Sequence, residues 1–499
     1  MQQGLVSRLA AAGRLSRFFV EAAPTELHCA TMQIHSLALR SLPAILARHR
    51  AMIAAVFLLS GAGVAEAAVP AVDASFNPYC QGRNRVAMFR CRLAVAQQTG
   101  NLPQITEITQ ALTLALGGQA GVPDEAPATY TIDFDAPALS VGQIGAAFEP
   151  YRKQVVRNAW WLSRPAPTGI AHPLRDVASI ITGALAARDA GAESAEQLLS
   201  IAESAADYLL WAQAQGGQGL FPFPAVRRNK GRAFEAAEKF LKRAEELGML
   251  PTAVSNDWII NDLGNGDLQF DNGLCGVAMI ELHRATRKEK YLQSAIAAAN
   301  WAIAQPVVPN WNYNSFSIHL LASLYAQTGD ARYLRHAKLK ARLGLYPGQL
   351  KAGARQGRWV DPHNARLVYH YVMIRSLGAL VAVLPQDDPD LTQAREVLSM
   401  ALAAGNAEII SRGVAHPSTV LETLAQLSLL FPPSSSTLPD LGRAQAFDLL
   451  ARHASSGFFA GRLPVDPGAW GLYLKALRMS GAPIEGSLNL PARRPGGTR

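Results

Sequence analysis

Two segments of the chain repeat one residue pattern at an offset of 42 positions. The first, GVAMIELHRATRKEKYLQSAIAAANWAI, begins at Gly276, and the second, SIHLLASLYAQTGDARYLRHAKLKARLGL, begins at Ser317. The matched residues include Leu282 with Leu324, Thr286 with Thr328, and Tyr291 with Tyr333. A repeat of this length corresponds to one helical hairpin. Because one hairpin cannot bury its apolar stripe alone, the repeat predicts hairpins that stack into a solenoid or close into a ring with a concave, ligand-binding centre.

Apolar residues recur with helical periodicity over almost all of the chain after Val141. An amphipathic helix is predicted over 143–163, before Pro165. The helices predicted after it cover 174–189, 195–215, 232–247, 274–286, 289–305, 316–328, 331–345, 365–384, 391–406, 417–430, 442–454 and 468–479. These twelve helices would make six hairpins. Before them, the sequence predicts one or two helices over 77–116 and a short strand over 129–134.

The connections between the predicted helices alternate in length. Those within hairpins are short and polar, whereas the segments 216–232, 251–272, 306–315 and 346–364 are long and rich in aromatic residues. Long irregular segments in a compact helical domain usually carry function. All of them fall on alternate connections, so in a ring they are expected to emerge at the same end.

The hairpin phrases TGDARYLRHA and TRKEKYLQSA, together with DYLLWAQAQGGQGLFPFP, resemble the (α/α) toroid superfamily of six-hairpin glycosidase-like proteins. The resemblance covers about residues 143–481. Locally, NYNSFSIHLLASLYAQTGDARYLRHA and RLVYHYVMIRSLGAL are similar to the C-terminal domain of glucuronyl C5-epimerases, and YLLWAQAQGGQGLFPFP is similar to a helix end of pectate lyases. The tryptophan that this pectate-lyase pattern has after its glycine pair is absent here. The resemblance implies an all-α fold, an (α/α)6-type toroid of helical hairpins, and carbohydrate chemistry.

The N-terminal region has the anatomy of a secretory signal peptide. Basic residues precede an apolar run at 51–64, which is followed by Ala65-Glu66-Ala67, a small-x-small cleavage site. The run is shorter than the ~20 residues that span a bilayer. The sequence therefore predicts a periplasmic or secreted protein, cleaved near Ala67, with no membrane span in the mature chain; Met32 is an alternative start to Met1. The expected divisions are 1–67 (upstream segment and signal), 68–140 (a short mixed N-terminal extension), 141–481 (toroid) and 482–499 (disordered tail).

Composition agrees with a large exported globular protein. Apolar residues make up 49% of the sequence, which is enough for a sizeable core, and the net charge of +9 comes without a cluster of Lys and Arg of the nucleic-acid-binding type. Cys80 and Cys91 are expected to pair in an oxidising compartment, with two free thiols as the alternative, and Cys275 is expected to be a buried small hydrophobe. No zinc spacing, phosphate-binding glycine loop, GxSxG or HExxH motif occurs.

The segment SNDWIINDLGNGDLQFDN, 255–272, is the densest polar cluster. Carboxylates beside aromatic rings are typical of sugar sites, because the rings stack on pyranose faces while paired acids transfer protons. The residues of interest are Trp258 as a stacking platform and Asp257, Asp262, Asp267 and Asp271 as candidate acids. Asp271 is alternatively a helix cap, and Asp262 and Asp267 are alternatively solvated loop residues. A calcium site here lacks the EF-hand spacing, so no cofactor is predicted.

Two further clusters carry candidate residues. In RWVDPHNARLVYHYVMIR, 358–375, side chains three or four positions apart can share a helix face: His363, Asn364, Arg366, Tyr369 and His370. In PNWNYNSFSIH, 309–319, the candidates for sugar contact are Trp311, Tyr313 and Asn314, while His319 is more typical of a core histidine. The alternative for the first cluster is that Asp361 caps the helix while Tyr369 and His370 pack sideways.

These patterns lead to one main functional hypothesis: an exported enzyme that acts on an acidic, uronic-acid-containing polysaccharide by lyase or epimerase chemistry. Arg366 with Asn364 or Asn314 would neutralise the substrate carboxylate, and Tyr369 or His370 would remove the proton at C5. One alternative is a glycoside hydrolase whose acids come from the 255–272 cluster. Another is a non-catalytic helical-repeat protein of the cell envelope that binds glycan or protein. The expected partner is a polysaccharide or oligosaccharide, not nucleic acid.

Overall fold

Helices make up most of the structure, a computed structural model that describes residues 77–124, 130–167, 169–192, 194–225, 232–431, 443–463 and 466–480. The predicted signal peptide and C-terminal tail lie outside these residues. The longer helices are α4 (Arg85–Gln98), α5 (Leu102–Leu116), α6 (Val141–Arg152), α7 (Pro173–Asp189), α8 (Ala195–Gly216), α9 (Arg232–Glu246), α11 (Leu268–Thr286), α12 (Glu289–Ala304), α13 (Trp311–Thr328), α14 (Ala331–Gly344), α16 (Leu367–Val383), α17 (Leu391–Arg412), α18 (Pro417–Leu430), α19 (Arg443–Phe459) and α20 (Pro467–Met479). Two short helices are α10 (Leu250–Ala253) and α15 (Pro362–Ala365).

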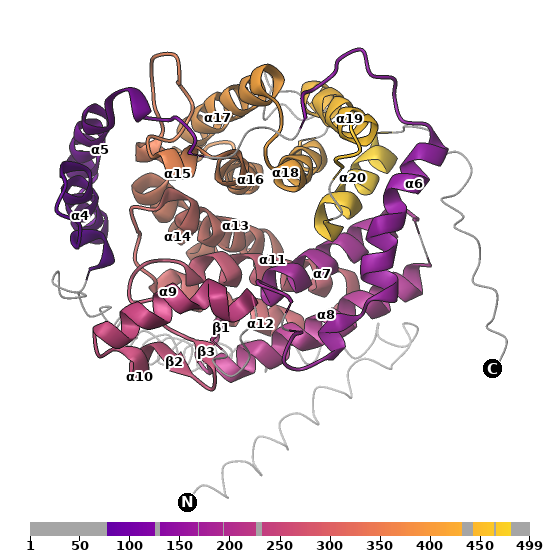
Figure 1. Cartoon of the computed structure of the whole chain (residues 1–499), viewed down its shortest axis with the longest axis horizontal. Coiled ribbons are helices and arrows are strands. Elements are labelled where there is room, and N and C mark those ends of the chain that lie inside the picture. The colour runs from indigo at the N-terminus through magenta and orange to yellow at the C-terminus, as the bar shows by residue number, and fades with distance from the viewer. Residues whose placement is uncertain are drawn as a thin grey trace, which may run out of the picture. The chain divides into compact units, whose positions relative to one another are not determined.

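Among the described residues, six helices close into an inner ring (Figure 1). In order around the ring they are α7, α11, α13, α16, α18 and α20, and α20 packs back onto α7. Each of the first five is paired with the next long helix of the chain, α8, α12, α14, α17 and α19 respectively, which lies outside it. This arrangement is an all-α (α/α)6 toroid, as the resemblance implied; of the solenoid and the ring that the hairpin repeat allowed, the ring is the one formed.

The outer partner of α20 is α6, so the last pair joins the beginning and the end of the ring in sequence (Figure 1). The sequence-based expectation that residues 232–247 form a ring hairpin is wrong. This segment is α9, which packs on α10 and on a short strand instead of on an inner helix. Its charged sequence, RAFEAAEKFLKRAEE, leaves too narrow an apolar stripe for a helix that must pack on two sides.

Ring closure depends on glycine at the contact between α7 and α20. Gly183 and Gly471 face each other there, and a Cβ on either one would overlap with backbone atoms of the other helix. Gly273 of α11 likewise lies against the backbone of Phe316 in α13. The three glycines thus allow neighbouring helices to lie closer together than a side chain at these positions would permit.

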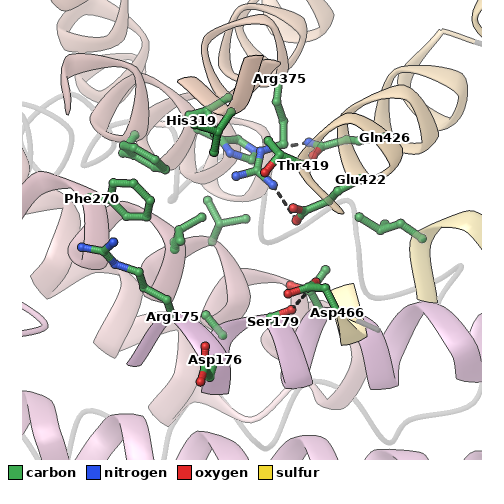
Figure 2. Close-up of a pocket in the computed structure, with 18 of the residues that line it drawn as sticks. Arg175, Asp176, Ser179, Phe270, His319, Arg375, Thr419, Glu422, Gln426 and Asp466 are labelled. Carbon is green, nitrogen blue, oxygen red and sulfur yellow. Dashed lines mark hydrogen bonds and ion pairs between the residues drawn. The ribbon is translucent and has the colours of Figure 1, made fainter. Parts of the chain in front are cut away.

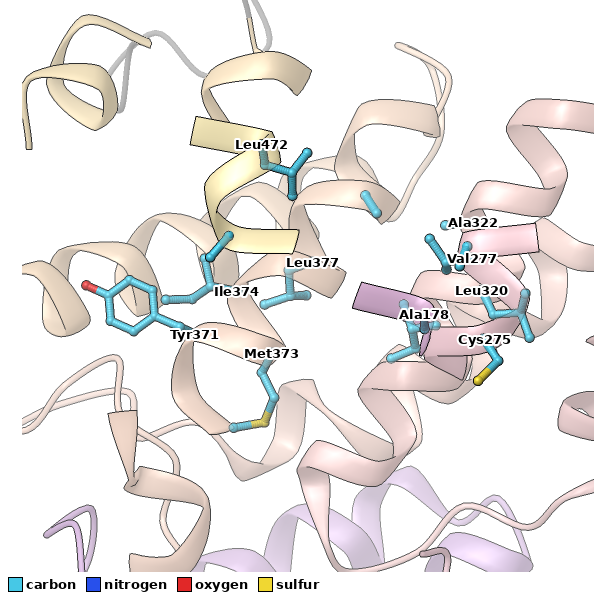
Figure 3. Close-up of a cluster of buried hydrophobic side chains, with 14 of the residues drawn as sticks. Ala178, Cys275, Val277, Leu320, Ala322, Tyr371, Met373, Ile374, Leu377 and Leu472 are labelled. Atoms are coloured by element: carbon cyan, nitrogen blue, oxygen red, sulfur yellow. The ribbon is translucent and has the colours of Figure 1, made fainter. Parts of the chain in front are cut away.

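The core lies between the inner helices and their neighbours, and Figure 3 shows a part of it contributed by α7, α11, α13, α16 and α20. Leu320, Ile374 and Leu377 are fully buried there. Burying side chains of this size contributes roughly 1.5–3 kcal/mol each. The inner helices are apolar around most of their circumference because they pack against two neighbouring inner helices and against an outer helix. A charged residue in these helices is therefore expected only where it is paired or faces water.

The N-terminal hairpin, α4 and α5, packs on the flank of the ring within one compact unit, Val72–Arg499. Cys80 and Cys91 form a disulfide at the base of this hairpin, while Cys275 is free and buried. Arg90 forms an ion pair with Asp361, and Gln97 donates to the Leu343 carbonyl oxygen at 3.1 Å. These contacts fix the hairpin beside the loop 346–364.

The strand predicted over 129–134 is not present in its described part, where Tyr130 forms a single bridge to Val414. A small antiparallel sheet occurs elsewhere, with the order β1 (Phe223–Pro224), β3 (Trp258–Ile259) and β2 (Val254–Ser255). It joins the segments 216–232 and 251–272. In the part of the chain that the structure describes, no helix is long and apolar enough to cross a bilayer.

Candidate functional site in the axis of the helical ring

A cavity of about 180 Å³ lies in the axis of the ring (Figure 2). Every inner helix contributes to its lining, from Arg175 in the first turn of α7 to Leu472 in α20. The polar side chains that line it are Arg175, Asp176, Ser179, Thr182, Glu281, His319, Arg375, Thr419, Glu422, Gln426 and Asp466. The centre of the ring is thus a polar chamber inside an apolar framework. We call it the axial cavity.

Carboxylates are the most prominent groups in the axial cavity. Asp466 accepts hydrogen bonds from the Ser179 hydroxyl at 2.8 Å and from the Ala469 N–H at 3.1 Å, and Glu281 accepts one from Thr182 at 2.8 Å. Burial, and then the negative charge of Asp466, raise the pKa of Asp176 to about 6. Burial also raises the pKa of both Glu281 and Glu422. Asp176 therefore carries a carboxyl group able to give up or take a proton close to neutral pH.

Two arginines balance these acids, each in a different way. Arg375 contacts Glu422, with 2.5 Å between Nη1 and Oε1. Arg175 donates to both carboxylate oxygens of Asp271, from Nε at 3.0 Å and from Nη2 at 2.8 Å. Its guanidinium also lies 3.7 Å from the ring centre of Phe270, in cation–π geometry.

His319 faces the axial cavity from α13 and is held there by a contact of 3.2 Å between its Nε2 and Nε2 of Gln426. Burial and the neighbouring charge of Arg375 lower the pKa of His319 to about 3. The imidazole is therefore neutral at physiological pH, and its Nε2 accepts the amide proton of Gln426.

A second cavity, of about 200 Å³, continues from the axial cavity at the end where the inner helices begin. The two share Arg175, and the second is lined further by His172, Phe223, Phe240, Ile259, Asp262, Asp267 and Asp271. Helix α9 and the strands β1 and β3 provide its apolar wall. We call it the mouth cavity.

The mouth cavity is organised by the segment 251–272, as its polar residues suggested. Asp262 accepts from the N–H groups of Gly264 and Leu268 and thereby holds the start of α11. Burial and the charge of Asp267 raise the pKa of Asp262 to about 6. Asp267 in turn binds the Tyr313 hydroxyl from the segment 306–315.

The long connections do converge at this end. The Asn272 side chain accepts from the Phe221 N–H at 3.1 Å, and Asn364 accepts from the Asn312 N–H at 2.8 Å. The rings of His363 and Tyr369 lie 4.5 Å apart. Asp267 and Asp271 thus line the mouth cavity, and Tyr313 adjoins it through its hydrogen bond to Asp267. His363 and Tyr369 line neither the mouth cavity nor the axial cavity.

Several predicted site residues occupy other positions. Trp258 is buried and packs edge-on against Trp211, with ring centres 5.6 Å apart, and it lines neither cavity. Asp257 is exposed in the turn before β3. Arg366, between α15 and α16, forms an ion pair with Asp124, at 2.6 Å between Nε and Oδ1, and lines neither cavity.

The catalytic role predicted for His370 needs correction. His370 is fully buried between α16 and α17, where its Nε2 lies 2.8 Å from the Ala401 carbonyl oxygen and its ring packs against Trp359 and Gly405. It faces away from the ring axis, because it lies on the opposite side of α16 from the cavity-lining Val368, Val372 and Arg375. A substrate in the axial cavity has no access to it.

The sugar-binding roles predicted for Trp311, Asn314 and Asn364 also need correction, because all three are buried and serve the fold. Trp311 packs closely against Gly348. The Asn314 amide bonds to the N–H and carbonyl of Val308 at 3.0 and 2.8 Å and to the carbonyl of Gly344 at 2.8 Å. Asn364 accepts from both the backbone and the side chain of Asn312.

Sequence reasoning missed most residues of the axial cavity, above all Asp176, Glu281, Arg375, Glu422 and Asp466. For Arg375 and Glu422 the signal was an isolated charge inside a helix that is otherwise apolar, as in MIRSLGAL and TVLETLAQL. Such a charge is costly unless it is paired or faces water. Within the described residues, no group of three or more His, Cys, Asp or Glu side chains is placed to hold a metal ion.

Comparison with known proteins adds little to this description. No family model matches the chain, and no curated protein matches it. One matching solved structure is the crystal structure of an unsaturated glucuronyl hydrolase specific for heparin, with 10% sequence identity, a TM-score of 0.29, and coverage of 68% of this chain and 98% of that one. A likeness at these values carries no information about the site residues of this chain.

Proposed function

We propose that this protein is a carbohydrate-active enzyme that hydrolyses an acidic, uronic-acid-containing glycan in the axial cavity. The observation that carries the proposal is the position of Asp176. Its carboxyl group, with a pKa raised to about 6 by burial and by Asp466, lies in a water-accessible chamber with other carboxylates and with arginine. A pair of carboxyl groups in different environments is the requirement for glycoside hydrolysis.

In this proposal Asp176 donates a proton to the leaving glycosidic oxygen. Asp466, whose Oδ1 accepts hydrogen bonds from the Ser179 hydroxyl and from the Ala469 N–H, activates the attacking water. Phe270 and Phe316, with ring centres 3.9 Å apart, provide an apolar wall against which a pyranose ring can pack. Arg375 in the lining favours a substrate that carries a carboxylate.

A lyase or epimerase is the second candidate, and the pair of His363 and Tyr369 favours it. Burial and the charge of Arg366 lower the pKa of His363, which keeps its imidazole neutral and able to accept a proton. Its ring lies against Tyr369. This pair would replace the predicted pair of Tyr369 and His370. The axial cavity argues against a purely structural helical-repeat protein, because a scaffold has no need of buried acids in its centre.

We also propose that the protein is exported through the signal at 51–67. The disulfide between Cys80 and Cys91 supports this, because structural disulfides persist mainly in oxidising compartments. Intact-mass analysis of the protein from the periplasm or medium is expected to show a chain that begins near Ala68. A chain that retains residues 1–67 in the membrane fraction would contradict export by a cleaved signal.

Incubation of the purified mature protein with a panel of acidic and neutral polysaccharides tests the reaction. Hydrolysis produces new reducing ends without the ultraviolet absorbance of an unsaturated uronate, whereas a lyase produces both. Epimerisation produces neither, but it exchanges the C5 hydrogen with deuterated water. Asp176→Asn is expected to abolish hydrolysis and His363→Ala to leave it largely intact; the reverse pattern, with absorbance, would favour the lyase. A folded protein that turns over none of the glycans would refute the enzymatic proposal.

A further inference from the structure

Arg375, in the lining of the axial cavity, has a guanidinium donor without a hydrogen-bond partner among the described residues. Its side chain is only 5% exposed, and its ion pair with Glu422 is made through Nη1. The adjacent Nε, also buried, has no hydrogen-bond partner among the described residues. Arginine binds carboxylates best through two parallel N–H donors. The present contact therefore leaves a donor unsatisfied in a chamber that has room for a ligand.

Arg175 is less available than Arg375 to bind an anionic ligand. Its Nε and Nη2 are both taken by Asp271, and Phe270 covers a face of its guanidinium. An anionic ligand would have to displace a buried two-point ion pair to reach it. Arg375 is thus the better candidate for binding a substrate carboxylate in this cavity.

Glu422 depends on Arg375 for its charge. Acidic neighbours reach it from other elements, Glu281 on α11 and Asp466 before α20. Arg375 on α16 is the cation in direct contact with it. The remaining charged or titratable side chains of the cavity lining are Arg175 and Asp176 on α7 and the neutral His319 on α13. If Arg375 is engaged by another anion, Glu422 is left among carboxylates with its main compensating charge removed.

We propose that the carboxylate of an acidic sugar takes Arg375 away from Glu422, and that Glu422 binds a proton from the solvent in the same event. This inference rests on the proposed function, since it names the group that recognises the uronate in the same cavity. No covalent bond of the sugar changes: the ligand arrives as an anion, water or buffer supplies the proton, and the total charge of the cavity is unchanged. Binding of an acidic sugar is then coupled to proton uptake.

The coupling fixes the direction of the pH dependence. A ligand that raises the proton affinity of Glu422 must bind more tightly when Glu422 is already protonated, because linkage is reciprocal. Affinity for an acidic sugar is therefore expected to rise as pH falls, by up to about tenfold per pH unit between the free and bound pKa of Glu422. An uncharged sugar has no carboxylate for Arg375 and is expected to show no such dependence.

Isothermal titration of the whole mature protein with sodium glucuronate, and with glucose as the uncharged probe, tests the coupling. Comparing buffers with different ionisation enthalpies counts the protons taken up. The wild type is expected to take up close to one proton per glucuronate. Glu422→Gln cannot bind a proton and leaves Arg375 available, so it should bind glucuronate at least as tightly, with no uptake and little pH dependence.

The matched control is Glu408→Gln, which removes an exposed ion pair with Arg412 on α17, outside the cavity; it should behave as the wild type. Asp176→Asn should retain the uptake. The inference is overturned if the wild type does not bind glucuronate or binds it without proton uptake. It is also overturned if the uptake is lost in Asp176→Asn but kept in Glu422→Gln. A folded Glu422→Gln that binds glucuronate more weakly would overturn it as well. If proton-coupled binding occurs but no glycan is turned over, the enzymatic proposal fails and this inference stands.

Discussion

Arg175 and Asp271 join the first turns of α7 and α11 by a two-point ion pair at the boundary between the axial and mouth cavities. The Asp271 side chain is only 2% exposed, and Arg175 is the cation that pairs with it. Removing one partner of a buried pair leaves an uncompensated charge, at a cost of about 3–5 kcal/mol. Arg175→Met is expected to lower the free energy of unfolding by about this amount, measured by urea denaturation.

The double variant Arg175→Met/Asp271→Asn is the control for that prediction. Because it removes both charges, its loss of stability should be clearly smaller than the sum of the two single losses. Additive losses would show that the two side chains stabilise the ring independently and not as a pair.

Asp176→Asn should change both turnover and the pH dependence of stability. As a general acid, Asp176 must be protonated, so wild-type hydrolysis should decline as pH rises above about 6, and the variant should lose about 10²-fold or more in kcat together with this limb of the profile. Since the folded-state pKa is raised, the folded protein binds more protons than the unfolded chain between pH 4 and 6, and its stability should fall as pH rises through this range.

In Asp176→Asn the stability should fall less as pH rises from 4 to 6, because asparagine does not titrate. Thermal unfolding across pH 4–7 measures this difference. Asp207→Asn, which alters an exposed partner of Lys290, is the matched control and should leave both profiles unchanged. If Asp176→Asn has the same kcat as the wild type, Asp176 takes no part in the reaction.

The helical hairpins were predictable because burial imposes a 3.6-residue periodicity on each helix, and the repeat around Leu282 and Leu324 makes it visible. The closure of the ring was not. It depends on α6 packing against α20 and on Gly183 meeting Gly471, which are contacts between distant parts of the chain. The periodicity of α9 predicted a helix, and only the narrowness of its apolar stripe distinguishes this helix from those of the ring.

The site was predictable only at its mouth. The 251–272 segment attracted attention because its polar residues cluster in sequence, and Asp262, Asp267 and Asp271 do lie at the mouth cavity. The acids of the axial cavity come singly from separate helices, so they converge only when the ring closes. Conversely, the amide-rich linkers appeared suited to sugars, but long loops also need side chains that satisfy their own buried backbone groups.

Asn314→Ala should therefore affect stability and not substrate binding. The amide of Asn314 is fully buried and satisfies the backbone of Val308 and Gly344, so its removal leaves these groups without their partner. Buried groups left unsatisfied cost about 1–3 kcal/mol each. Urea denaturation is expected to show a loss of a few kcal/mol, while KM for any glycan that is turned over stays close to the wild-type value. A raised KM with unchanged stability would restore the sugar-binding role.

Lys340 provides a test of burial that is independent of the proposed reaction. This α14 side chain is 3% exposed, and its Nζ donates to the Gln305 carbonyl at 2.9 Å and to Gln269 at 3.4 Å, with no carboxylate paired to it in the described part of the chain. Burial lowers the pKa of Lys340 to about 7.

Between pH 7 and 10 the unfolded chain then carries a proton on this lysine that the folded protein lacks, so folding is increasingly favoured as pH rises. Relative to Lys340→Met, the wild type should gain up to about 1.4 kcal/mol of unfolding free energy per pH unit in this window, measured by urea denaturation at pH 7, 8 and 9. Lys290→Met, at an exposed position, should run parallel to the wild type. If the unfolding free energy of Lys340→Met also changes with pH in parallel to that of the wild type, Lys340 stays charged inside the fold.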